Sequence, residues 1–144
     1  MRAKHWYLAG EVPDTMDGRF ALLATVVALV TLRLEAAGGD GVAASVGLTE
    51  AFIDDMDAQM RQQGFDATLS KQVRSLVGSL ASRVDRWRRL IASSGDWQAA
   101  VRTSVYRDVP VNDDAVDYMT GKLRSLWDRL GATSLDDMLA GRFA

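Results

Sequence analysis

The sequence predicts an all-α fold: a single-domain bundle of five to six helices around one central apolar helix at about residues 14–37. Three observations predict it. Between Phe20 and Leu32 there is no charged residue and nothing more polar than threonine. Elsewhere apolar residues recur at spacings of three and four, which is the period of a helix. No stretch shows the period-two alternation that is typical of a half-buried strand.

The central apolar run is too short to cross a membrane. It extends only over residues 20–32, whereas a membrane-spanning helix needs about 20 apolar residues. A signal peptide has basic residues before its apolar stretch, but here the preceding charges include Glu11, Asp14 and Asp17. We therefore expect a core helix contacted from several sides, with these six residues each touching at least two other helices: Leu22, Leu23, Val26, Val27, Leu29 and Val30.

The remaining helices are predicted from capping and stop signals in chain order. Their expected ranges are at least 49–63 (an extension back to residue 42 is left open), 69–91, 97–107, 112 or 113 to at least 130, and 135–140. Gly38–Gly41 is expected to be a loop before the first of these helices. The residues expected to cap helix N-termini are Asp14, Thr68, Asp96, Asn112 or Asp113, and Ser134. All 144 residues are expected to form one domain.

Composition argues against most catalytic chemistry. The chain has no cysteine and one histidine, His5, so disulfides, thiolate metal sites and cysteine nucleophiles are excluded. No nucleophile-elbow or phosphate-loop pattern occurs. The net charge of −2 excludes a globally basic nucleic-acid binder. We therefore expect no enzyme activity, no cofactor, no metal and no DNA partner.

Two clusters of charge remain to be explained. The helix at about 49–63 carries an acidic group, Glu50, Asp54, Asp55 and Asp57, and the helix at 69–91 carries six cations against Asp85: Lys71, Arg74, Arg83, Arg86, Arg88 and Arg89. The acids form either a cation or acid–base site or a solvated face. The cations either contact an anionic surface, such as lipid or a ribosome, through Lys71, Arg74, Arg86 and Arg89, or pair with the acids of the neighbouring helix.

The segment before the central helix resembles the start of the ubiquinol–cytochrome c chaperone family, whose members are assembly factors for respiratory complex III. The resemblance rests on Glu11–Phe20, and its most specific residues are Val12, Pro13, Asp14, Thr15, Asp17, Gly18, Arg19 and Phe20. It continues in order through Asp55-Met56-Asp57, Gly64-Phe65-Asp66, the basic helix with Lys71, Arg74 and Arg83, and Tyr106-Arg107, and covers about residues 5–107. The sequence departs from the family pattern at Gln72 and Ser75, where the basic helix carries fewer charges than usual, and at Ala81-Ser82, where an aromatic residue followed by glycine is common.

This resemblance implies a noncatalytic, membrane-associated chaperone that binds newly synthesised cytochrome b. It implies a cytoplasmic protein peripherally associated with the inner membrane, with a ribosome, an anionic membrane surface or a partner subunit as further partners. The alternative is a binding protein or an enzyme for a small molecule, a quinone or a lipid. It would hold this molecule in the apolar groove that a chaperone would use for its client.

A helical chaperone binds an apolar client helix in a groove between its own helices. The candidate lining residues are large side chains at the edges of apolar stripes: Phe65, Trp97, Tyr106, Met119 and Trp127. Residues 11–20 have two interpretations, a structural clasp at the start of the central helix and a contact with the client or a partner.

Overall fold

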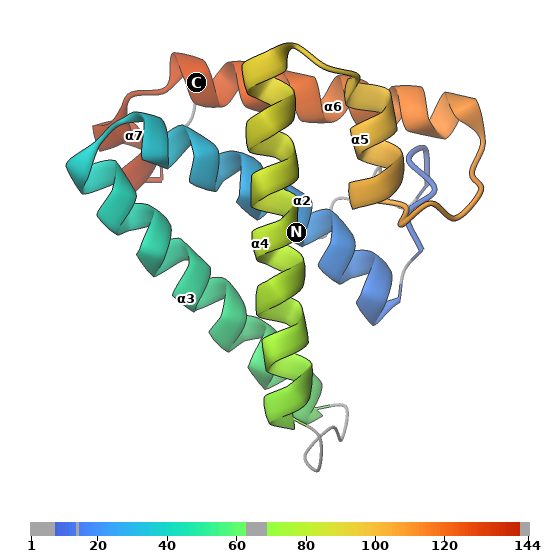
Figure 1. Ribbon diagram of the computed structural model, residues 1–144, viewed down its shortest axis with the longest axis horizontal. Helices are drawn as coiled ribbons and strands as arrows, with labels where there is room; N and C mark the ends of the chain where they lie inside the picture. The colour runs from blue at the N-terminus through green and yellow to red at the C-terminus, as the bar shows by residue number, and fades with distance from the viewer. Residues whose placement is uncertain (1–7, 14, 63–68, 142–144) are drawn as a thin grey trace.

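The protein is an all-α bundle, as predicted (Figure 1). Its computed structural model describes residues 8–13, 15–62 and 69–141. Within these residues there are six helices and no strand: α2 (Met16–Ala36), α3 (Gly39–Gln62), α4 (Leu69–Ser93), α5 (Trp97–Ser104), α6 (Asp113–Ala132) and α7 (Leu135–Leu139).

Helix α2 is the centre of the bundle. It contacts α3, α4, α5 and α6, and every residue from 20 to 32 is buried or half-buried. None of the six apolar residues expected to be covered is exposed, and Leu22 and Leu29 are almost completely buried. No helix among the described residues is long and apolar enough to cross a membrane. An apolar run of this length therefore serves as a core helix.

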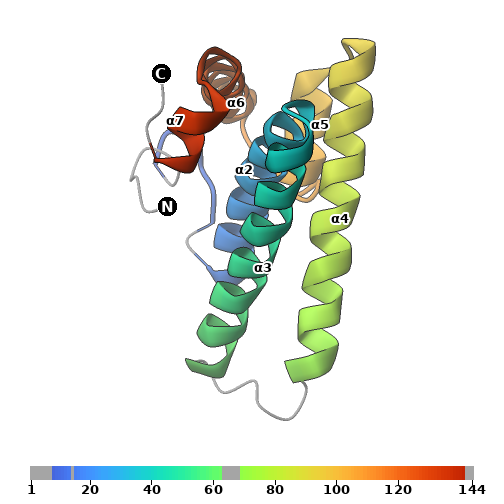
Figure 2. The ribbon, with the colours of Figure 1, turned by 90° about the vertical axis from the view of Figure 1, so that its left-hand side faces the viewer.

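The two sides of α2 belong to two apolar clusters. One cluster joins α2 to α5, α6 and the C-terminal part of α4, and includes Leu29, Trp87 and Met119. The other joins α2 to α3 and α4, with the rings of Phe20 and Phe52 5.6 Å apart. Figure 2 shows the bundle from the side, with α4 toward the right, α3 in the middle in front of α2, and α6 and α7 toward the left.

The prediction of a loop over Gly38–Gly41 is wrong about the length of the loop. The turn between α2 and α3 is confined to Ala37 and Gly38, and Gly39 is already the first residue of α3. A Cβ on Gly41 would overlap the carbonyl oxygen of Leu34. Gly41 therefore lets the start of α3 pass closely over the end of α2, which is a packing role that a loop signal does not reveal.

Local capping chemistry fixes most helix ends. Asp96, Asn112 and Ser134 accept hydrogen bonds from backbone N–H groups of α5, α6 and α7, as predicted. The cap of α2 is Thr15 rather than Asp14, because Oγ1 of Thr15 accepts from the N–H of Gly18 at 3.1 Å. Asp14 and Thr68 lie outside the described residues.

Helices α3 and α4 form an antiparallel pair that is open at one end. In Figure 1 they approach each other toward the bottom and separate toward the top, with α2 crossing behind them. This arrangement produces the groove described below.

Candidate functional site

Four of the five residues expected to line a client groove are described by the structure, and all four lie in or against the large apolar cluster. Trp97, Tyr106 and Met119 are 7%, 3% and 0% exposed and belong to the large apolar cluster. Trp127 is half-buried against the same cluster, and Phe65 lies outside the described residues. The periodicity placed these side chains at the edges of stripes, but neighbouring helices cover those edges.

Trp97 illustrates how complete this cover is. Its ring meets Trp87 of α4 edge-on, with centroids 4.9 Å apart and planes at 68°, an arrangement that aromatic pairs favour. The guanidinium of Arg124 lies over the Trp97 ring, 4.7 Å from its centroid. The ring is thus held from α4 and α6 and is unavailable to a client in this conformation.

The segment before α2 and the first turns of α2 are held in place by close packing and hydrogen bonds. A Cβ on Gly18 would overlap the carbonyl oxygen of Pro13, so only glycine permits this approach. Val12 is 2% exposed within the large apolar cluster, and Phe20 is buried in the smaller one. Asp17 lies 3.7 Å from Arg107 in an exposed ion pair. These contacts are the ones that a structural clasp requires.

Tyr106 ties this segment to the turn after α5 and to the start of α6. Its hydroxyl is within hydrogen-bond reach of the carbonyl oxygens of Gly10 and Ala115. Burial, with a smaller effect from the charge of Glu11, raises the pKa of Tyr106 to about 12. The neutral hydroxyl is therefore the stable form, and it acts as a structural donor at neutral pH.

The cations of α4 divide into two groups. Arg83 is 7% exposed, and its guanidinium donates to the carbonyl oxygen of Ser104 at the end of α5, at 3.0 and 3.2 Å. Burial, and then the charges of Arg86 and Arg107, lower the pKa of Arg83 to about 10. Arg88 bonds to Glu35 and Asp85, and the hydrogen bond to Glu35 is the main cause of its raised pKa.

The other cations of α4 remain at the surface. Lys71, Arg74 and Arg89 are exposed and Arg86 is half-buried, and the ion pairs found among the described residues involve none of them. Their helical positions place all four on one face of α4. Three of the four cations expected at the surface are therefore exposed and Arg86 is half-buried, whereas Arg83 is buried and Arg88 forms surface ion pairs with Glu35 and Asp85.

The acids of α3 do not pair with α4. Asp57 pairs with Arg61 one turn along the same helix. Asp55 accepts a hydrogen bond from Gln59 at 2.9 Å. In the described part of the chain no ion pair joins α3 to α4, and no cluster of three or more potential ligands could hold a metal. Ion pairs between the acids of α3 and the cations of α4 are therefore not what holds these two helices together.

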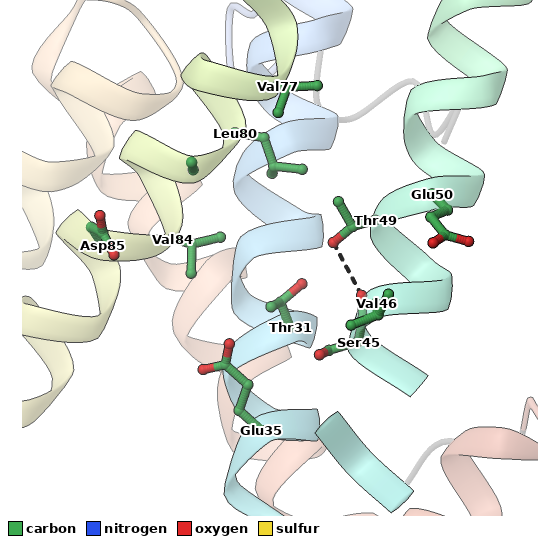
Figure 3. Close-up of a pocket in the computed structure, with 11 residues that line it drawn as sticks. Thr31, Glu35, Ser45, Val46, Thr49, Glu50, Val77, Leu80, Val84 and Asp85 are labelled. Atoms are coloured by element: carbon green, nitrogen blue, oxygen red, sulfur yellow. Dashed lines mark hydrogen bonds between the residues drawn. The ribbon is translucent and has the colours of Figure 1, made fainter. Parts of the chain in front are cut away.

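A groove lies between α3 and α4, with α2 as its floor (Figure 3). Its cavity has a volume of about 350 Å³. We call it the α3–α4 groove, and its lining residues are Thr31, Glu35, Ser45, Val46, Thr49, Glu50, Val77, Leu80, Ala81, Val84 and Asp85.

The walls of the α3–α4 groove are apolar and partly open to solvent. Val46 on α3 is 54% exposed and Val77 on α4 is 44% exposed. Val77 belongs to the apolar stripe of α4, but it lies on the wall of this groove and not in the core. Leu80 and Val84 continue the apolar wall toward α2.

These features define an all-helical bundle with an open apolar groove on its surface. A family model described as Ubiquinol-cytochrome C chaperone matches residues 9–144, which is nearly the whole chain. The chain belongs to the ubiquinol–cytochrome c chaperone family. No curated protein and no solved structure shows a significant match to it. Family membership associates the protein with the assembly of respiratory complex III.

Proposed function

We propose that the protein is a noncatalytic chaperone that binds newly synthesised cytochrome b through the α3–α4 groove and holds it for assembly into complex III. Family membership supports the assembly role. The observation that carries the binding site is the pair of exposed valines, Val46 and Val77, on the two walls of one groove. Apolar side chains in such a position lower the free energy of the complex when a partner removes them from water.

The test is copurification of cytochrome b from solubilised membranes with the full-length chain. The variant Val46→Glu/Val77→Glu places two charges on the groove walls without altering buried side chains. We expect cytochrome b to fall to background with this variant, while its thermal unfolding stays close to that of the wild type. Retention of cytochrome b at the wild-type level by the folded variant would exclude the α3–α4 groove as the client site.

Two control variants separate the groove from other exposed apolar positions. Leu139 on α7 is 57% exposed, and Leu139→Glu should leave copurification unchanged. Val109 is 54% exposed, the same as Val46, but lies beside Arg107 and Asp108, near the segment before α2. Loss of cytochrome b with Val109→Glu alone would instead assign client contact to that segment, the alternative interpretation of residues 11–20.

The exposed cations of α4 suggest how the chaperone is brought to its client. We propose that Lys71, Arg74, Arg86 and Arg89 contact an anionic membrane surface or the ribosome, which gives a peripheral location at the membrane. Each cation near an anionic membrane contributes about 1 kcal/mol. Arg74→Glu/Arg89→Glu should reduce sedimentation with anionic liposomes or with ribosomes, and salt should weaken the wild-type interaction. Equal sedimentation of both proteins at low salt would remove this role.

A small-molecule function is the second candidate. The volume of the groove, about 350 Å³, lies at the lower end of the range for small-ligand pockets, about 300–1,000 Å³. A quinone or lipid ligand would raise the unfolding temperature of the wild type and not that of Val46→Glu/Val77→Glu. The exposed valines favour the client, because a ligand-binding cavity usually encloses most of its ligand.

A further inference from the structure

Thr31 has an unusual environment on the floor of the α3–α4 groove. It is 6% exposed, and its hydroxyl is the one buried side-chain polar atom among the described residues that has no hydrogen-bond partner. Figure 3 shows Thr31 on α2 between Ser45 and Thr49 of α3 on one side and Val84 of α4 on the other. An unpaired polar group is thus set into the floor of an apolar groove.

Other threonines in these helices satisfy their hydroxyls locally. Thr25, Thr49 and Thr120 donate to the carbonyl oxygen four residues earlier, at 2.8, 3.0 and 2.8 Å. This back-bonding is the usual solution for threonine within a helix. Thr31 does not make such a bond, so its hydroxyl remains able to donate or accept. A buried hydroxyl without a partner destabilises the folded state, and an occupant with a polar group would remove that cost.

The charges of the groove are of one sign. Its lining contains Glu35, Glu50 and Asp85 and no lysine or arginine. Glu35 and Asp85 share Arg88, which lies outside the lining. Glu50 is exposed and has no ion pair in the described part of the chain. The rim on α3 therefore favours a cationic occupant over an anionic one.

The size of the groove limits how much it encloses. A volume of about 350 Å³ accommodates a few side chains but not a whole helix, whose diameter with side chains is about 10–12 Å. An occupant helix must lie across the opening and insert the side chains of one face. Such helix-in-groove binding uses residues at i, i+3, i+4 and i+7 as anchors.

We propose that the α3–α4 groove binds the basic end of a membrane-spanning helix, which inserts apolar side chains between Val46 and Val77, bonds a polar side chain to Thr31 and places lysine or arginine beside Glu50. This inference rests on the proposed function, since it specifies the segment of the client. Membrane proteins carry an excess of lysine and arginine in the loops on one side of the membrane. Their helices also use serine and threonine for hydrogen bonds to other helices.

Labelled synthetic peptides test this chemistry directly with the full-length protein. The reference peptide is a leucine–alanine helix with one serine on its docking face and two lysines at one end. A second peptide replaces both lysines by glutamate, and a third replaces the serine by alanine. Fluorescence anisotropy in detergent below its micelle concentration gives the Kd of each. We expect the Kd of the reference peptide to be about tenfold or more below that of the glutamate peptide. Glu50 attracts the lysines of the first peptide and repels the glutamates of the second.

Protein variants then assign each preference to a residue. Glu50→Gln should reduce the preference for lysine over glutamate by about threefold or more, and the control Asp136→Asn on α7 should leave it unchanged. Thr31→Val should weaken the serine peptide by about three- to tenfold and leave the alanine peptide unchanged. Equal binding of the lysine and glutamate peptides, or equal effects of Thr31→Val on the serine and alanine peptides, would overturn the proposal.

The outcomes for the two proposals are separable. If Val46→Glu/Val77→Glu loses cytochrome b in copurification but the peptides show no charge or serine preference, the inferred segment is wrong and the client site stands. If the peptides behave as expected but the variant retains cytochrome b, the proposed function is wrong. Tighter binding of a short-chain quinone than of any peptide would overturn the inference. Self-association of the wild type that Val46→Glu abolishes would also overturn it, because the groove would then hold a second copy of the chain.

Discussion

Val46 of α3 and Val77 of α4 lie on opposite walls of one groove, and each exposes about half of its side chain. The two residues come from helices that approach each other where α3 ends and α4 begins, and that separate toward the other end (Figure 1). Between them, α2 provides a floor that includes the unpaired hydroxyl of Thr31. Exposed apolar side chains of this kind raise the free energy of the free protein, and a bound partner lowers it by removing them from water.

Replacing Thr31 by valine should stabilise the free protein. Valine has nearly the same shape but no hydroxyl to leave unsatisfied, so the free energy of unfolding should rise by about 1 kcal/mol. The matched control is Thr25→Val, which removes a hydroxyl already bonded to Ala21 at 2.8 Å and should give no gain. Urea unfolding measures both. A Thr31→Val variant less stable than the wild type would show that the hydroxyl is satisfied in the folded state.

Arg83 should contribute to stability although none of the carboxylates in the described part of the chain pairs with it. Its guanidinium bonds to the carbonyl oxygen of Ser104, while the hydroxyl of Ser104 accepts from the indole N–H of Trp87 at 2.9 Å. Arg83→Met leaves that carbonyl unpaired at the C-terminus of α5, and should lower the free energy of unfolding by about 1–3 kcal/mol. Arg89→Met, at an exposed position of the same helix, should change it by less than about 0.5 kcal/mol. Similar losses for both variants would argue against the capping role.

Gly18 should tolerate no side chain. A Cβ there overlaps the carbonyl oxygen of Pro13, so Gly18→Ala should cost about 1–3 kcal/mol through overpacking. Gly121 in α6 has open space around its missing Cβ, and Gly121→Ala should raise stability by about 0.5–1 kcal/mol. Thermal unfolding of the two variants gives the comparison. A stable Gly18→Ala protein would mean that the approach of Pro13 to α2 is not required.

Tyr106 should make stability fall at alkaline pH. Its folded pKa is about 12, above the ordinary value of 10.0, so the unfolded chain loses the proton first. The stabilisation is fully present below about pH 10 and is lost as pH rises from 10 toward 12. Tyr106→Phe should therefore be less stable at pH 8 and show a shallower decline above pH 10. The same slope in both proteins would assign the decline to other groups.

Local features of the sequence predicted much of the fold. The caps Asp96, Asn112 and Ser134 act on their own helices, so residue type and position were sufficient to find them. The apolar run of α2 likewise predicted its central position. Periodicity shows which side chains share a face of a helix but not which neighbour covers that face. For this reason Trp97, Tyr106 and Met119 were placed in a groove and are core residues.

The candidate site depends on tertiary geometry that no local pattern contains. Val77 belongs to the apolar stripe of α4, yet in the structure it lines the groove and is 44% exposed. Thr31 resembles the other helical threonines in sequence, and its lack of a backbone partner appears only in the structure. Arg83 resembled the surface cations beside it, whereas contact with α5 buries it.

The most direct test of the account is site-specific photo-crosslinking in cells. A photoreactive amino acid is introduced separately at positions 46, 77 and 139 of the full-length chain, and cytochrome b is detected among the crosslinked products. The account predicts crosslinks to cytochrome b from positions 46 and 77, on the two walls of the groove, and none from position 139 on α7. Copurification of cytochrome b without a crosslink from either groove position, or with a crosslink only from position 139, would contradict it.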